Sequence, residues 1–234
     1  MRDHVLSANS RDVWDRVWES DAYAAESERS ARATKRIADF ALDRASREGG
    51  AILDIGCGSG DLLRALRRHG ASGRLVGMDQ SSRALAFARR QSREGDIIYV
   101  RGDCRLLPFS DESFDVVTAF GVLEHVREHV QLLDELLRVT KKGASAYLSS
   151  SNARSVLQIL NRAKSAVGCY PYGYQRNWTL PVLAEQLQNR FEIKQTFISH
   201  AADDMPRVAA IDKFIAQKIP EWGRYICFVL TKRG

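Results

Sequence analysis

Three glycines stand at alternate positions in the segment LDIGCGSGDLL, which covers residues 53–63. Gly56, Gly58 and Gly60 let the backbone approach a ligand closely and adopt positive φ values. An apolar run precedes the segment and a helical pattern follows it, so its backbone N–H groups are expected at a helix N-terminus, where they can bind a ligand. The segment therefore predicts a ligand site at the mouth of a sheet.

The residues around these glycines indicate which kind of ligand. The dinucleotide fingerprint has a glycine at its sixth position, and this chain has Asp61 there. Asp54 stands two places before the first glycine. A carboxylate at that place repels a pyrophosphate but accepts hydrogen bonds from a cationic nucleoside that bears an amino acid. The pattern therefore favours S-adenosylmethionine over a nicotinamide dinucleotide.

Short apolar runs alternate with helical patterns from residue 51 onward, and this rhythm is typical of a parallel sheet covered on both faces. Thr179 is expected to be the N-cap of a late helix. We therefore predict an α/β fold with a doubly wound, seven-stranded, mostly parallel sheet. The expected strands are 51–55, 74–78, 96–100, 114–120, 144–150, 191–199 and 225–230.

The 234 residues are long enough for one domain with insertions. Residues 51–151 are expected to form the cofactor-binding core of this domain. The other expected parts are an N-terminal helical lid at 1–50, lid insertions at 152–178 and 201–224, and a closing helix and strands at 179–200 and 225–234.

Residues 51–150 resemble the class I S-adenosylmethionine-dependent methyltransferases, particularly the group that modifies small molecules. The resemblance rests on the glycine segment and on three further stretches, VGMDQSS, VRGDCRLLPF and LPFSDESFDVV. It implies a Rossmann-like fold, S-adenosylmethionine as the cofactor and methyl transfer to a small molecule. It also implies the cofactor-binding residues, which are Asp54, Gly56, Cys57, Gly58, Gly60, Asp79, Gln80, Asp103, Cys104, Phe120 and Gly121.

Two acids in this set have distinct roles in the family. The acid that ends the second strand, here Asp79, binds the ribose hydroxyls, and the acid after the third strand, here Asp103, holds the adenine amino group. Taken alone, Asp79 could also be a helix N-cap and Asp103 a turn residue. Cys57 and Cys104 are interpreted as small neutral residues that line the site, because no base nearby would lower their pKa.

The resemblance places Glu124 and His125, in the run AFGVLEHVREH, near the chemistry. His125 is the candidate general base if the acceptor is a hydroxyl, and the alternative is a structural histidine. Some relatives have a metal-binding Glu-x-x-Glu-His sequence here, but this chain has Gly121 at the first glutamate position. We therefore expect no metal.

Aromatic residues outside the core are candidates for the acceptor site. With one arginine they suit a planar or glycosidic ligand that carries an anionic or carbonyl group. The alternative is that the rings seal a lid against the core. The candidates are Trp14, Trp18, Tyr23, Tyr170, Tyr172, Tyr174, Arg176 and Trp178.

The net charge of +6 makes an RNA methyltransferase the alternative function. The arginines are interleaved with acids, however, and no RNA-binding appendage is recognisable, so a nucleic-acid partner is not expected. Neither a spanning segment nor a signal peptide is visible, and the four cysteines show no disulfide pattern. A cytoplasmic protein without a membrane partner is expected, as a monomer or homodimer that performs O- or N-methylation of a natural-product or cofactor-type metabolite.

Overall fold

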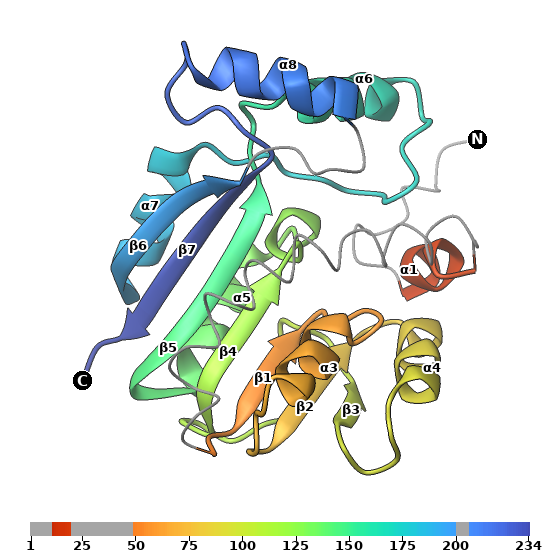
Figure 1. Ribbon diagram of the computed structural model, residues 1–234, viewed down its shortest axis with the longest axis vertical. Helices are drawn as coiled ribbons and strands as arrows, with labels where there is room; N and C mark the ends of the chain where they lie inside the picture. Colours follow the sequence, from red (N-terminus) through yellow and green to blue (C-terminus); the bar gives the residue numbers. More distant parts are fainter. Residues whose placement is uncertain (1–10, 20–48, 200–205) are drawn as a thin grey trace.

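The computed structural model describes residues 11–19, 49–199 and 206–234 (Figure 1). Seven strands form one sheet in the order β3-β2-β1-β4-β5-β7-β6. Neighbours from β3 to β5 are parallel, whereas β7 is antiparallel to both β5 and β6. This confirms the expected seven-stranded, mostly parallel sheet. The strands are β1 (Ile52–Ile55), β2 (Leu75–Asp79), β3 (Ile98–Arg101), β4 (Phe114–Phe120), β5 (Thr140–Ser151), β6 (Phe191–Ser199) and β7 (Tyr225–Lys232).

Helices cover both faces of the sheet, which makes the fold doubly wound as expected. Leucines of α5 and α7 pack against one face, and leucines of α3 and α4 pack against the other. Strand β1 is buried at all four positions, as a strand covered on both faces must be. The helices are α1 (Arg11–Val17), α3 (Asp61–Arg68), α4 (Ser82–Gln91), the short η2 (Leu123–His125), α5 (His129–Val139), α6 (Val156–Ala166), α7 (Leu180–Gln188) and α8 (Pro206–Ala216).

Three expectations about local structure are corrected. Strand β3 begins at Ile98 rather than 96, because Asp96 closes a turn with Arg93. Strand β5 begins at Thr140, four residues before the expected start at 144, because Thr140 already pairs with β4. Thr179 is the residue before α7, as expected, but its side chain caps no backbone N–H group.

The two expected insertions each contain a helix, α6 and α8, and these helices contact each other. Figure 1 shows them together beyond the carboxyl end of β5. Of the expected lid at 1–50, only residues 11–19, 49 and 50 are described.

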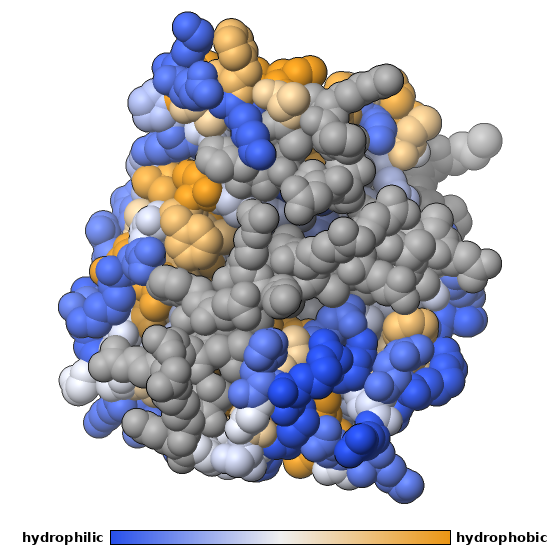
Figure 2. Space-filling model, viewed as in Figure 1, coloured by the Kyte–Doolittle hydropathy of each residue, from blue (hydrophilic) through white to orange (hydrophobic). Residues whose placement is uncertain are grey.

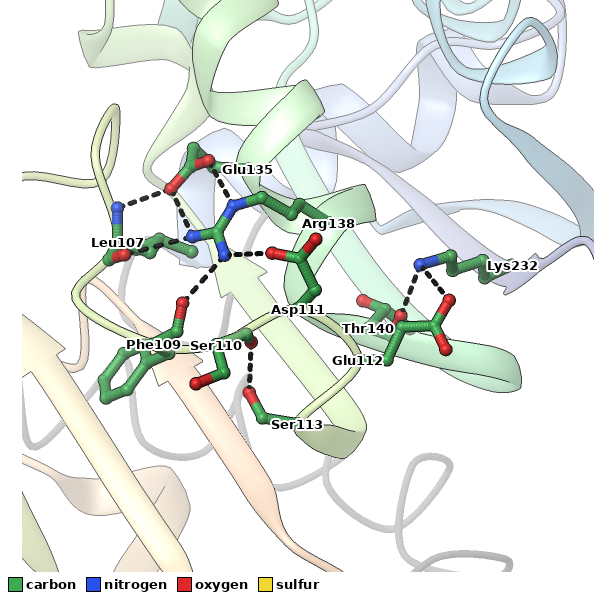
Figure 3. A network of polar contacts seen from close by, with 10 residues as sticks. All are labelled: Leu107, Phe109, Ser110, Asp111, Glu112, Ser113, Glu135, Arg138, Thr140 and Lys232. Carbon is green, nitrogen blue, oxygen red and sulfur yellow. Dashed lines mark hydrogen bonds and ion pairs between the residues drawn. The ribbon is translucent and has the colours of Figure 1, made fainter.

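Arg138 of α5 holds the connection between β3 and β4 in place (Figure 3). Its guanidinium group donates to both carboxylate oxygens of Glu135, at 2.6 and 2.8 Å, and to Asp111 at 2.8 Å. It also donates to the carbonyl groups of Leu107 and Phe109, and Glu135 in turn accepts from the Leu107 N–H. The hydrogen bond from Arg138 lowers the pKa of Glu135. One side chain thus fixes the stretch that follows Asp103.

Replacing Arg138 should therefore destabilise the fold. Arg138→Leu removes the guanidinium donor of two carboxylates and two carbonyl groups, so we expect the free energy of unfolding to fall by about 2–4 kcal/mol. Arg68→Leu, at an exposed position of α3, should change it by no more than about 0.5 kcal/mol. Chemical denaturation followed by circular dichroism measures both values. Equal losses for the two variants would contradict the structural role of Arg138.

Candidate functional site

A pocket opens where β1, β2 and β4 end, at the edge of the sheet where doubly wound folds bind ligands. It brings together eleven of the residues singled out in the sequence: Trp14, Trp18, Gly56, Gly58, Asp79, Gln80, Asp103, Cys104, Phe120, Gly121 and His125. Four further lining residues were not predicted, and they are Met78, Gly102, Val122 and Val126. Each of these four is next to a predicted residue in the chain, which is the signal that could have found them.

The glycine turn is tied to the end of β2. The N–H groups of Gly56 and Cys57 donate to the carbonyl of Met78, at 2.7 and 3.0 Å, and the Gly58 N–H donates to Asp79 at 2.9 Å. Gly56 and Gly58 have φ values of +68° and +52°, which favour glycine. A Cβ atom on Gly58 would lie 3.0 Å from the ring of Trp18. The turn therefore leaves no room for side chains at the pocket wall.

Asp79 presents its carboxylate to this pocket. Its two oxygens accept from the N–H groups of Gly58 and Ser81, both at 2.9 Å. The N-cap of α4 is Ser81, whose hydroxyl accepts from Ala84, so the alternative interpretation of Asp79 as the helix N-cap is wrong. Burial raises the pKa of Asp79. Each carboxylate oxygen has a second lone pair, which can accept a hydrogen bond from a hydroxyl group of a ligand.

Three predicted cofactor residues lie behind the pocket wall. Asp54 is buried, accepts from the Thr118 hydroxyl at 2.7 Å, and has its pKa raised to about 7 by burial and by the charge of Asp79. Cys57 is also buried, and burial raises its pKa. Gly60 is the N-cap of α3. These residues shape the turn from beneath and are not among the residues that line the pocket.

The two cysteines near the site are kept as thiols. Cys104 lines the pocket, and burial raises its pKa to about 12. Since the pKa of Cys57 is raised as well, neither sulfur is a thiolate at neutral pH. This agrees with their interpretation as small neutral residues.

Asp103 lines the pocket but is held in an ion pair. Arg105 contacts both of its carboxylate oxygens and reaches 2.6 Å from one of them, and it also binds Glu128 at 2.9 Å. The hydrogen bonds to Asp103 are the main cause that raises the pKa of Arg105. Arg105 thus links Asp103, the acid predicted to face adenine, to Glu128 at the N-terminus of α5.

His125 is oriented by the segment that precedes α7. Its Nδ1 lies 3.0 Å from the carbonyl oxygen of Tyr174. A carbonyl only accepts, so Nδ1 carries the proton and Nε2 of the neutral ring has the lone pair. The Trp14 ring meets the imidazole edge-on, with 4.9 Å between ring centres. His125 therefore has the tautomer and the pocket position that a general base requires.

Glu124 faces the opposite way from its neighbour in the chain. Its side chain is buried, and its carboxylate oxygens accept from the hydroxyls of Ser150 and Ser151 at 3.0 and 2.9 Å. Its carbonyl accepts from the Arg176 N–H at 2.7 Å. Glu124 therefore joins η2 to the end of β5 and to the segment that holds His125. The structure does not place it in the pocket, where a catalytic role would require it.

Ser151 extends this contact to α6. Its hydroxyl accepts from the side-chain amides of Gln158 and Gln175, at 3.2 and 3.0 Å. The amide of Gln175 also donates to Gln158 at 2.9 Å. A buried polar network thus connects η2, β5, α6 and the segment before α7.

Of the predicted acceptor residues, only Trp14 and Trp18 line the pocket, and Tyr23 lies outside the described residues. Trp178 is 1% exposed and belongs to the core, with Arg176 4.1 Å above its ring. Trp178 therefore fits the alternative interpretation, in which the aromatic rings seal a lid against the core.

The predicted tyrosines form a layer beside the pocket-lining residues. The rings of Tyr172 and Trp14 are stacked, with 6.2 Å between their centres, and Tyr170 meets Tyr172 edge-on. The Tyr174 ring lies beneath Arg127, at 4.4 Å. None of these three residues lines the pocket, but the Tyr172 ring contacts two lining residues, Trp14 and His125.

Helix α1 is fastened over the pocket by Asp15, which the sequence did not reveal. Asp15 accepts from the hydroxyl of Ser81 at 2.6 Å and from that of Ser82 at 3.3 Å, at the N-terminus of α4. Burial alone would raise the pKa of Asp15, but these hydrogen bonds and one from the Arg83 backbone lower it. Its partners are more than sixty residues away, so no local pattern could have found it.

No cluster of three or more His, Cys, Asp or Glu side chains in the described part of the chain is arranged to hold a metal ion. Within the same ranges, every helix is too short or too polar to cross a bilayer.

Comparison with known proteins identifies the central segment. Residues 53–148 match the methyltransferase domain family. The chain is 41% identical to a 2-phytyl-1,4-naphtoquinone methyltransferase of Nostoc punctiforme, over 44% of this chain and 46% of that one. It is 37% identical to a ubiquinone biosynthesis O-methyltransferase of Hahella chejuensis, over 49% and 48%. The chain thus spans about half the length of these curated relatives.

The fold as a whole also has known counterparts. A putative methyltransferase, solved in complex with the Haloferax volcanii Trm112 methyltransferase activator, superposes with a TM-score of 0.73. The match covers 97% of each chain at 21% identity. The described chain therefore has the Rossmann-like methyltransferase fold that the sequence predicted.

The position of Glu124 leads to a prediction about His125. Glu124→Ala removes the acceptor of two buried hydroxyls, so the free energy of unfolding should fall by about 2–4 kcal/mol. The segment that carries the Tyr174 carbonyl should loosen, and the imidazole should become a mixture of tautomers, seen as shifted imidazole ¹⁵N resonances.

Two matched variants make this prediction specific. Glu124→Gln keeps an oxygen acceptor and should change both quantities less, and Glu185→Ala, at an exposed position of α7, should change neither. Unchanged imidazole ¹⁵N resonances in a folded Glu124→Ala protein would show that Glu124 does not position His125.

Proposed function

We propose that this chain, whose residues 53–148 match the methyltransferase domain family, transfers a methyl group from S-adenosylmethionine to a small-molecule acceptor. One observation carries the proposal. A single pocket joins a glycine turn, a carboxylate at the end of β2 and an oriented histidine. The first two suit an adenosine-bearing cofactor, and the third suits the removal of a proton from an acceptor.

The residues of the pocket fit this cofactor. Gly56 and Gly58 present bare backbone at the pocket wall, which suits the methionine and ribose portions. The carboxylate oxygens of Asp79 can accept further hydrogen bonds from the ribose hydroxyls. Asp103 lies farther round the same wall, where it suits the adenine amino group. The bound cofactor supplies a methyl group activated by a positively charged sulfur. Asp54 and Asp79 place carboxyl groups under this part of the pocket, which favours a cation there.

The contribution of the chain to the reaction is positioning and proton removal. Nε2 of His125 takes the proton from a hydroxyl acceptor, while Nδ1–H stays bonded to the Tyr174 carbonyl. This hydrogen bond also stabilises the imidazolium that forms. Trp14 of α1 and Trp18, just after this helix, line the pocket, where their rings would shield the reacting atoms from water. Glu124 performs no step in this scheme, because its carboxylate faces Ser150 and Ser151.

A small molecule suits this pocket better than RNA. Seven arginines of the described residues form ion pairs with acidic side chains, so part of the basic charge is neutralised locally. The curated relatives named above are quinone-pathway methyltransferases by name. Electron-rich aromatic hydroxyl compounds such as catechols and hydroquinones are therefore the acceptors that we would test first.

The cofactor assignment is tested at Asp79. Asp79→Asn removes the charge but keeps the shape, so S-adenosylmethionine should bind more weakly by about 1–3 kcal/mol. Asp134→Asn, on the exposed side of α5, is the matched control and should bind like the wild type. Isothermal titration calorimetry measures both dissociation constants. An unchanged constant for Asp79→Asn would remove this residue from the site.

The base assignment is tested with His125→Asn, whose side-chain amide can still donate to the Tyr174 carbonyl but has no basic nitrogen. Turnover of a catechol should fall about 10²–10⁴-fold, with the dissociation constant for the cofactor nearly unchanged. The fall should be smaller for an acceptor that is already ionised at the assay pH.

Two outcomes would contradict parts of this proposal. A His125→Asn enzyme that keeps more than about a third of wild-type turnover would exclude general-base catalysis. Tight cofactor binding by the wild type without transfer to any phenol, catechol, hydroquinone or amine would indicate a binding protein rather than an enzyme.

A further inference from the structure

Exposed apolar side chains gather on one face of the molecule, formed by α6, α8 and the residues just after them. Most large apolar side chains in the described residues are buried, and six of the ten that are exposed lie here. Figure 2 shows apolar surface at the same end of the molecule. We call this surface the α6–α8 face, and its apolar residues are Ile159, Leu160, Val167, Ile211, Phe214 and Ile219.

The spacing of four of these residues places them in two apolar stripes, one along α6 and one along α8. Ile159 and Ala163 are four residues apart and lie along one side of α6, and Val167 follows at the same spacing as the C-cap of this helix. Ile211 and Phe214 are three apart on α8 and share a side in the same way. Val167 is 73% exposed and Phe214 is 61% exposed. Single exposed apolar residues are ordinary, but a contiguous group of this kind marks an interaction surface.

The same face is positively charged. Residues 156–170 and 206–220 contain five basic residues and a single acidic one. Arg162, Lys164, Lys213 and Lys218 are exposed. In the described part of the chain none of these four forms an ion pair, unlike the seven paired arginines elsewhere.

We propose that the α6–α8 face docks on the surface of a bilayer that carries anionic headgroups. Helices that lie in a membrane interface combine exposed apolar side chains with lysine and arginine, and anionic lipids attract each such charge. The centres of protein–protein interfaces are instead depleted in lysine. The combination of apolar stripes with cations that form no ion pair within the described ranges therefore favours a lipid surface over a protein partner.

Surface docking needs no spanning segment, so it is compatible with helices that are too short or too polar to cross a bilayer. The face is also joined to the candidate site. Gln158, on the buried side of α6, donates to Ser151, and Ser151 donates to Glu124. If the proposed function holds, docking would bring the pocket to the membrane, where a lipid-soluble acceptor is concentrated. The docking itself does not depend on that function.

The test is co-sedimentation of the full chain with vesicles, without cofactor or acceptor. The wild type should bind vesicles that contain phosphatidylglycerol and should bind vesicles of phosphatidylcholine alone much more weakly. Added salt should weaken the binding. Ile159→Ser combined with Phe214→Ser should weaken it about tenfold or more. Lys164→Glu combined with Lys213→Glu should do the same.

Matched variants away from the face serve as controls. Val182→Ser changes a similarly exposed aliphatic residue of α7, and Lys142→Glu reverses an exposed charge near the start of β5. Both should bind vesicles like the wild type. Circular dichroism and S-adenosylhomocysteine binding check that every variant is folded.

Three results would overturn the proposal. The first is no binding to phosphatidylglycerol vesicles, and the second is equal weakening by the face and control variants. The third is a wild-type dimer, seen by analytical ultracentrifugation, that is lost in the variant carrying both Ile159→Ser and Phe214→Ser. Without vesicle binding, this result would make the face a contact between two copies. Because the assay contains neither cofactor nor acceptor, its failure leaves the proposed methyl transfer untouched.

Discussion

Three consecutive backbone N–H groups, those of Gly56, Cys57 and Gly58, are bound to the end of β2, and the geometry of the site depends on this connection. They fix the turn after β1 against Met78 and Asp79, so the position of the carboxylate and the shape of the pocket wall are set together. The parallel pairing of β1 and β2 makes these hydrogen bonds possible by ending both strands at one edge.

The opposite wall is built from parts that are distant in the chain. His125 comes from the end of β4, but its ring is oriented by a carbonyl almost fifty residues later. That carbonyl is held near β5 because Glu124 binds two serines there and accepts from Arg176. The buried carboxylate has hydroxyl partners, which keep it hydrogen-bonded inside the core. The orientation of His125 on one side of η2 is thereby linked to the packing of Glu124 on the other side.

The sequence was sufficient for the sheet, since strands buried on both faces produce apolar runs that flanking helices separate. Strands β4 and β6 have the expected bounds. It was also sufficient for pocket residues at the end of a strand, such as Asp79 of β2. It failed for Glu124, because adjacency to His125 says nothing about which side of a short helix a residue faces. The anchoring role of Asp15 and the burial of Trp178 were equally hidden, since both depend on segments brought together only by the fold.

The placement of the indole rings has an optical consequence. The chain has four tryptophans, and two of them, Trp14 and Trp18, line the pocket. Trp178 is enclosed in the core at 1% exposure, where it is shielded from solutes. A molecule that enters the pocket changes the surroundings of the first two rings and leaves Trp178 as an internal reference. The natural ultraviolet fluorescence of the protein is thus a direct gauge of whether its pocket is filled.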